Sequence, residues 1–120
     1  MPGKGKRMVI DYKNVEWKAV PNFKGGEGTV FTKMEDDGLN KYLIMKMPPA
    51  TTTGYHIHEG SSEIIYILEG EGKTNENGNI VPVHAGMSCY CPEGESHQMI
   101  NDSDGDLIFF AVVPTQHRED

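Results

Sequence analysis

The chain has 120 residues, which is enough for one compact domain with a hydrophobic core and too few for two ordinary domains. Its 11 Lys and Arg stand against 18 Asp and Glu, and the resulting net charge of −7 disfavours binding to nucleic acid. No apolar run is long enough to cross a bilayer, and no apolar stretch follows the N-terminal basic residues as in a secretion signal. We therefore expect a single-domain, cytoplasmic protein that binds neither nucleic acid nor a membrane.

Glycine and proline are spread through the chain and divide it into segments of strand length. Residues 1–7 are basic and rich in glycine, and we expect a flexible segment there. The domain is expected to span residues 8–114, and residues 115–120 to form a polar tail. The expected strands, in chain order, lie at residues 8–11, 15–20, 30–33, 42–47, 64–68, 72–74, 80–83, 87–91, 97–100 and 107–113.

Two of these segments indicate which side chains face the interior. In residues 42–47, strand alternation directs Leu43, Met45 and Met47 inward. Residues 64–68 form a continuous apolar run rich in β-branched and aromatic residues, as expected for a strand covered on both faces.

Asn77-Gly78 stands between two strand segments and is the strongest short-range signal for a two-residue type I′ hairpin. No segment shows sustained helical periodicity. About nine or ten short strands without helices must close on themselves or stack as two sheets, because an open sheet would leave exposed edges. The sequence therefore predicts an all-β barrel or jelly roll.

Four residues from separate parts of the chain form a candidate metal site. His56 and His58 are two positions apart, which places both imidazoles on one face of a strand. Alone, this pair is a weak signal, since two surface histidines are the commoner explanation. Glu63 opens the apolar run, where an inward carboxylate needs a partner. His97 follows a turn at residues 92–95 and supplies a third imidazole.

Three imidazoles and one carboxylate suit Fe, Mn, Co, Ni, Cu or Zn better than Ca or Mg. We expect one divalent transition metal ion, whose identity this donor set leaves open. Four protein ligands on an octahedral ion leave two positions for water, a chelating substrate or dioxygen. The expected partner is therefore a small molecule.

The spacing of these residues resembles the first motif of the cupin family, Gly-x5-His-x-His-x3to4-Glu-x6-Gly. Here the pattern runs from Ala50 through His56, His58 and Glu63 to Gly70, and the opening glycine is replaced by Ala50.

The second cupin motif is Gly-x5-Pro-x-Gly-x2-His-x3-Asn, and residues 86–101 match its spacing throughout, with His97 as the ligand and Asn101 as the last residue. Met87 stands where many members carry Asp, which puts the hydrogen bonding of a turn in doubt but touches no ligand.

The resemblance implies a double-stranded β-helix (jelly-roll) barrel with one metal in its mouth and, usually, a homodimer. Cupins include dioxygenases, isomerases, lyases and metal-free binding modules, so the fold leaves the function open. Intact ligands favour a metalloenzyme that acts on a small oxygenated substrate. The alternative is a non-enzymatic module that binds a sugar or another small ligand. Apolar residues on outward strand faces, among them Tyr66, also indicate a homodimer.

Several residues are candidates for a pocket beside the ion, although each is more often plain core. Tyr55 is a weak candidate for a catalytic acid, because the neighbour of a ligand on a strand points to the opposite face. The candidates are Met45, Met47, Tyr55, Tyr66, Tyr90, Cys91, Gln98, Met99 and Phe110.

Cys89 and Cys91 share one strand face with parallel side chains, which suits a disulfide poorly, so we expect two reduced thiols. Cys91 is either a redox-sensitive thiol near the ion or, more commonly, a small buried hydrophobe. His84 and His117 lie outside both motifs, and we expect them to be solvated.

Overall fold

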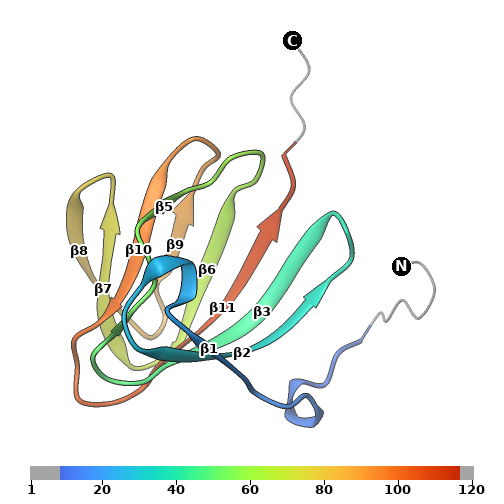
Figure 1. Ribbon diagram of the computed structural model, residues 1–120, viewed down its shortest axis with the longest axis horizontal. Helices are drawn as coiled ribbons and strands as arrows, with labels where there is room; N and C mark the ends of the chain where they lie inside the picture. Colours follow the sequence, from blue (N-terminus) through green and yellow to red (C-terminus); the bar gives the residue numbers. More distant parts are fainter. Residues whose placement is uncertain (1–8, 117–120) are drawn as a thin grey trace.

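The structure, a computed structural model, describes residues 9–116 and is built almost entirely of antiparallel strands (Figure 1). The strands form two sheets that enclose one hydrophobic core, which confirms the predicted all-β barrel. Some predictions fall outside the described residues. These are the flexible segment at residues 1–7, the part of the polar tail at residues 117–120, and the solvated His117.

The larger sheet has six strands in the order β1-β2-β3-β11-β6-β9. In Figure 1, β6, β11, β3 and β2 follow one another across the right-hand part of the view. Its strands are β1 (Lys18–Pro21), β2 (Thr29–Asp36), β3 (Asn40–Met47), β11 (Leu107–Pro114), β6 (Glu63–Glu69) and β9 (Ser88–Cys91).

The smaller sheet has the order β4-β10-β7-β8, and β5 also pairs with β10. Sequence reading missed β4 and left β5 undefined, since each has only two residues. The strands of this sheet are β4 (Thr51–Thr52), β5 (His56–Ile57), β7 (Glu71–Glu76), β8 (Asn79–His84) and β10 (Ser96–Asn101).

The start of the described chain differs from the prediction, because no strand forms at residues 9–11. Asp11 instead caps the 3-10 helix η1 (Tyr12–Asn14), and its carboxylate accepts hydrogen bonds from Lys13 N at 3.1 Å and from Asn14 Nδ2 at 3.0 Å. Aspartate competes for local backbone donors in this way, and that local bonding replaced the predicted strand.

The core lies between the two sheets and is formed by the inward side chains at alternate positions along the strands. Leu43, Met45 and Met47 are all buried there, as their alternation predicts. Across the β3–β11 ladder, Met45 pairs with Phe109 and Met47 with Leu107. These apolar contacts supply the interior against which the strands hold their register.

Within the described part of the chain, residues 64–68 are covered on one face and not on both. Ile65 and Ile67 are buried, but Ile64, Tyr66 and Leu68 are 45–48% exposed. Nothing in residues 9–116 covers the outer face of β6. The apolar run therefore has alternate residues in the core and the others exposed on the outer face.

The hairpin predicted at Asn77-Gly78 is present between β7 and β8. Both turn residues have positive φ angles, 54° for Asn77 and 95° for Gly78, as a type I′ turn requires. Two short 3-10 helices, η1 and η2 (Phe23–Gly25), are the helical elements of residues 9–116, and neither approaches the length or apolarity of a membrane-spanning helix.

Candidate metal centre

Three separate segments bring the four predicted ligands together. β5 carries His56, and His58 follows directly after it. Glu63 begins β6, and His97 lies in β10, where its Cα is paired with that of His56. The His-x-His pair thus begins on a strand, and the ladder to β10 adds the third imidazole.

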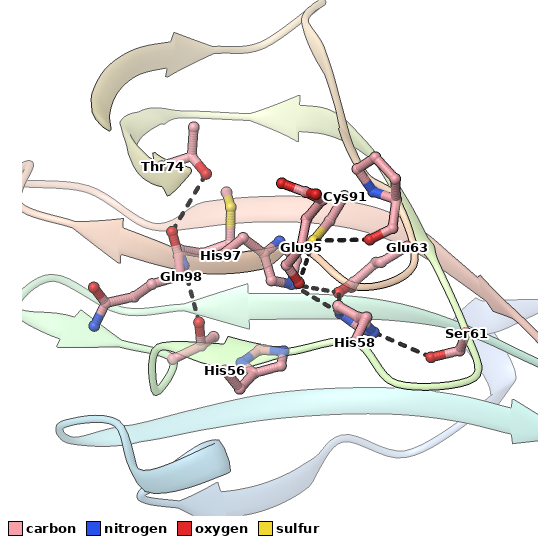
Figure 2. Close-up of polar contacts among 12 residues, drawn as sticks. His56, His58, Ser61, Glu63, Thr74, Cys91, Glu95, His97 and Gln98 are labelled. Atoms are coloured by element: carbon pink, nitrogen blue, oxygen red, sulfur yellow. Dashed lines mark hydrogen bonds and ion pairs between the residues drawn. The ribbon is translucent and has the colours of Figure 1, made fainter. Parts of the chain in front are cut away.

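The ligand atoms converge on one point inside the barrel mouth (Figure 2). His58 Nε2 and His97 Nε2 each lie 3.0 Å from Glu63 Oε1 and 3.0 Å from each other. The His56 ring stands 4.8 Å from that of His97 and 5.0 Å from that of His58, measured between centroids. One ligand atom from each of the four residues lies within 4.8 Å of the others.

Hydrogen bonds from the outer ring nitrogens orient two of the imidazoles. His56 Nδ1 lies 2.6 Å from the carbonyl oxygen of Gly54. A carbonyl oxygen only accepts, so Nδ1 carries the proton and Nε2 keeps its lone pair. His58 Nδ1 lies 3.2 Å from Ser61 Oγ. Such outer partners fix the tautomer of metal-binding histidines, and no sequence signal pointed to Gly54 or Ser61.

The electrostatics keep the ligands in the forms that bind cations. Burial by itself raises the pKa of Glu63, but hydrogen bonds from His58 and His97 outweigh it and lower the pKa to about 2. Burial also lowers the pKa of His56. Near neutral pH the site therefore holds an ionised carboxylate beside a neutral imidazole.

The geometry fits a metal ion. Ligand atoms at about 2.1 Å from a common ion and at right angles to one another are about 3.0 Å apart. The three separations among His58 Nε2, His97 Nε2 and Glu63 Oε1 have this value. With Nε2 of both histidines deprotonated, these three atoms direct lone pairs toward one point, which is the arrangement that binds a cation. The group His56, His58, Glu63 and His97 is therefore placed to hold a metal ion.

A small open pocket lies directly beside the centre. Its volume is about 170 Å³, and His97, Cys91, Glu76 and Tyr90 are among the residues that line it. Sites for drug-sized ligands usually occupy roughly 300–1,000 Å³, so this pocket suits a molecule of only a few non-hydrogen atoms. A larger depression of about 580 Å³, lined by residues 102–106 among others, does not include the four residues. Another of about 480 Å³ is lined by His58, Glu59 and Glu93 among others.

Of the other predicted pocket residues, Gln98 and Phe110 are partly buried. Met45, Met47 and Met99 are buried in the core. Tyr55 and Tyr66 are each 48% exposed, and this exposure agrees with the outward orientation expected for Tyr55 next to His56. Of the three predicted tyrosines, Tyr90 is the one that lines the small pocket.

Both cysteines are free thiols, and they pair across the β6–β9 ladder with Ile65 and Glu63. Burial, followed by the charges of nearby glutamates, raises the pKa of both Cys89 and Cys91 to about 11. Both therefore remain protonated near neutral pH, so they are poor nucleophiles there.

Several motif residues have structural roles. Ala50 stands where the motif has glycine and adopts φ 65°, a left-handed conformation that favours glycine. Asn101 is buried and donates to the carbonyls of Met47 at 2.7 Å and Gly105 at 2.9 Å. At Met87 the turn keeps its backbone bonds, including Met87 N to His84 O at 3.1 Å.

The fold and the four converging residues are those expected of a cupin with a candidate metal site, and comparison with known proteins supports the family. Residues 43–113 match the sequence profile of the cupin domain. The chain belongs to the cupin family.

The chain is similar to a protein of Thermotoga maritima named oxalate-binding protein, with 38% identity over 91% of this chain and 95% of the relative. It is also similar to a crystal structure from the same organism described as a predicted oxalate decarboxylase. The TM-score is 0.86 at 36% identity, covering 91% of this chain and all of the other. The structure of KdgF from Halomonas shares the fold at 15% identity, with a TM-score of 0.73 over 92% of this chain and 96% of the other.

Proposed function

We propose that this cupin holds one divalent transition metal ion on His56, His58, Glu63 and His97, and that a small carboxylate chelates the ion through two oxygens. The observation that carries the proposal is the mutual 3.0 Å separation of two imidazole nitrogens and one carboxylate oxygen beside a pocket of about 170 Å³. The names of the two Thermotoga maritima relatives support a small dicarboxylate, oxalate, as the first ligand to test.

Whether the ligand is released unchanged or converted separates two candidate functions. The relative named oxalate-binding protein favours a non-enzymatic binding module. The structure described as a predicted oxalate decarboxylase favours a metalloenzyme of the lyase class. The bound ion would polarise a chelated carboxylate, while the protein residues would orient the ligand and limit its size.

The proposal is tested on the protein as purified and after removal of its metal. We expect one metal ion per chain by elemental analysis, and melting temperatures that rise with oxalate only in the metal-loaded protein. Assays for carbon dioxide, formate and oxygen uptake then separate turnover from binding. Absence of stoichiometric metal, or an oxalate effect that survives metal removal, would contradict the proposal.

We also propose that the protein acts in the cytoplasm, since its two free thiols suit a reducing compartment.

We propose further that a second copy of the chain covers the outer face of β6. Ile64 pairs with Tyr90 across the β6–β9 ladder, and Tyr66 pairs with Phe110 across the β6–β11 ladder. With Leu68 these side chains form a continuous outer patch, here named the β6 face, of a kind that usually marks an interface.

A further inference from the structure

A carboxylate that is not among the four ligands lies beside the metal centre. Glu76 ends β7, and its Cα is paired with that of His97 in the β7–β10 ladder. Directly opposed residues of antiparallel strands point to the same face, with Cβ atoms about 5 Å apart. Because His97 points into the barrel mouth, Glu76 points there as well.

A further observation places Glu76 at the pocket beside the centre. Glu76 is half-buried and lines the pocket of about 170 Å³ together with His97 and Cys91.

Glu76 differs from the other carboxylate that lines this pocket. Glu95 accepts a hydrogen bond from Asn77 Nδ2 at 2.5 Å. Within residues 9–116, the side chain of Glu76 makes neither a hydrogen bond nor an ion pair. A half-buried carboxylate without a protein donor beside a ligand pocket is available to accept a hydrogen bond from the ligand.

We propose that Glu76 tunes the ligand preference of the centre, weakening the binding of dicarboxylates such as oxalate relative to small 2-hydroxy acids. This inference rests on the proposed function, since it assumes that the ligand chelates a metal ion held by the four residues. It deepens that function by assigning the choice among small chelators to one residue.

The selection follows from hydrogen-bond chemistry and charge. An ionised carboxylate accepts hydrogen bonds and cannot donate them. A 2-hydroxy acid that chelates through one carboxylate oxygen and its hydroxyl oxygen keeps an O–H that donates to Glu76. Fully ionised oxalate has acceptor oxygens alone, and its second negative charge is repelled by Glu76. The volume of this pocket fits a hydroxy acid of the size of glycolate or lactate.

The test compares glycolate and oxalate in calorimetric titrations of Mn²⁺-loaded protein at one pH near neutrality, after the affinity for Mn²⁺ alone has been measured. Because oxalate chelates free ions more strongly, each oxalate-to-glycolate affinity ratio is divided by the ratio for free Mn²⁺. We expect this normalised ratio to be lowered by about tenfold or more in the wild type. Glu76→Gln removes the charge at nearly constant shape and should bring the ratio close to that of the free ion.

Two control variants separate charge at this position from other effects. Glu76→Asp keeps the charge and should retain the wild-type preference. Glu71→Gln removes one charge at the other end of the same strand, where the residue is exposed, and should leave the ratio unchanged within about twofold.

The outcomes distinguish this inference from the proposed function. Protein that binds no Mn²⁺, or binds it without taking up either acid, overturns the proposed function and the inference with it. Binding of both acids with the same ratio in wild type and Glu76→Gln overturns the inference alone. Loss of Mn²⁺ from Glu76→Gln would make Glu76 a ligand and also overturn its role in selection.

Discussion

The three imidazole rings converge because hydrogen bonds at Nδ1 or strand pairing fix the position of each one. His56 donates from Nδ1 to Gly54 O, His58 Nδ1 contacts Ser61 Oγ, and His97 is paired with His56 across β5 and β10. A ring with a fixed tautomer loses little freedom when it binds an ion, which is the contribution of outer partners to metal affinity.

His56→Ala or His97→Ala should abolish stoichiometric metal binding, lowering the affinity for the metal ion by more than about a hundredfold, while the barrel remains folded. The core is formed by residues such as Met45 and Phe109, which neither change touches. Elemental analysis and circular dichroism measure the two effects. His84→Ala is the matched control, because His84 is exposed and lies outside the metal group. Retention of one ion per chain in both ligand variants would refute the assignment.

A second prediction concerns Ala50, the residue that replaces the opening glycine of the first cupin motif. Its φ of 65° costs an L-residue roughly 1–2 kcal/mol, partly offset by the greater entropy that glycine loses on folding. Ala50→Gly should therefore raise the free energy of unfolding by roughly 0.5–1 kcal/mol, measured by urea denaturation. An unchanged or lower stability would show that the left-handed conformation is not strained here.

Among the secondary-structure elements, the short helix η2 is hydrogen-bonded to the segment that leads from β4 to His56. Gly54 N donates to Phe23 O at 2.9 Å, and Thr52 N donates to Glu27 O at 3.0 Å. A Cβ added at Gly54 would lie 1.7 Å from the carbonyl oxygen of Lys24. The chain can pass under η2 at this point only because residue 54 has no side chain.

Gly54→Ala should therefore push η2 away from the strand and shift the backbone that carries His56. We expect a loss of roughly 1–3 kcal/mol in the free energy of unfolding together with weaker metal binding, measured by denaturation and metal titration. Gly105→Ala is the control, since a Cβ there meets nothing within 4 Å. Equal stability of the two variants would mean that η2 moves aside without cost.

For the whole molecule, the β6 face is an exposed apolar surface whose cover we propose to be a second copy of the chain. Tyr66 and Tyr90 on it are 48% and 60% exposed. If a second copy covers the face, Tyr66→Glu should convert a dimer into a monomer, because the charge would be buried without a partner. Light scattering after gel filtration measures the mass. Ile80→Glu, at a 52% exposed position on β8 of the other sheet, should leave the mass unchanged, and a monomeric wild type would disprove the proposal.

Local patterns in the sequence were sufficient to predict much of the fold and to name the four residues that the structure brings together. The alternation in β3 and the Asn77-Gly78 turn are properties of adjacent residues, and the structure confirms both. The motif spacing that named His56, His58, Glu63 and His97 is also local within each motif, and the structure brings all four together. Such features are readable because strand periodicity and turn chemistry act within a few residues.

Features that depend on which strands become neighbours could not be predicted from the sequence and were seen in the structure alone. It placed Glu76 opposite His97, left the outer face of β6 exposed, and set η2 against Gly54. It also replaced the predicted strand near Asp11 with a capped 3-10 helix. Ladder pairing joins residues far apart in the chain. The four candidate ligands could therefore be named from motif spacing, whereas Glu76, which the β7–β10 ladder places beside them, could not.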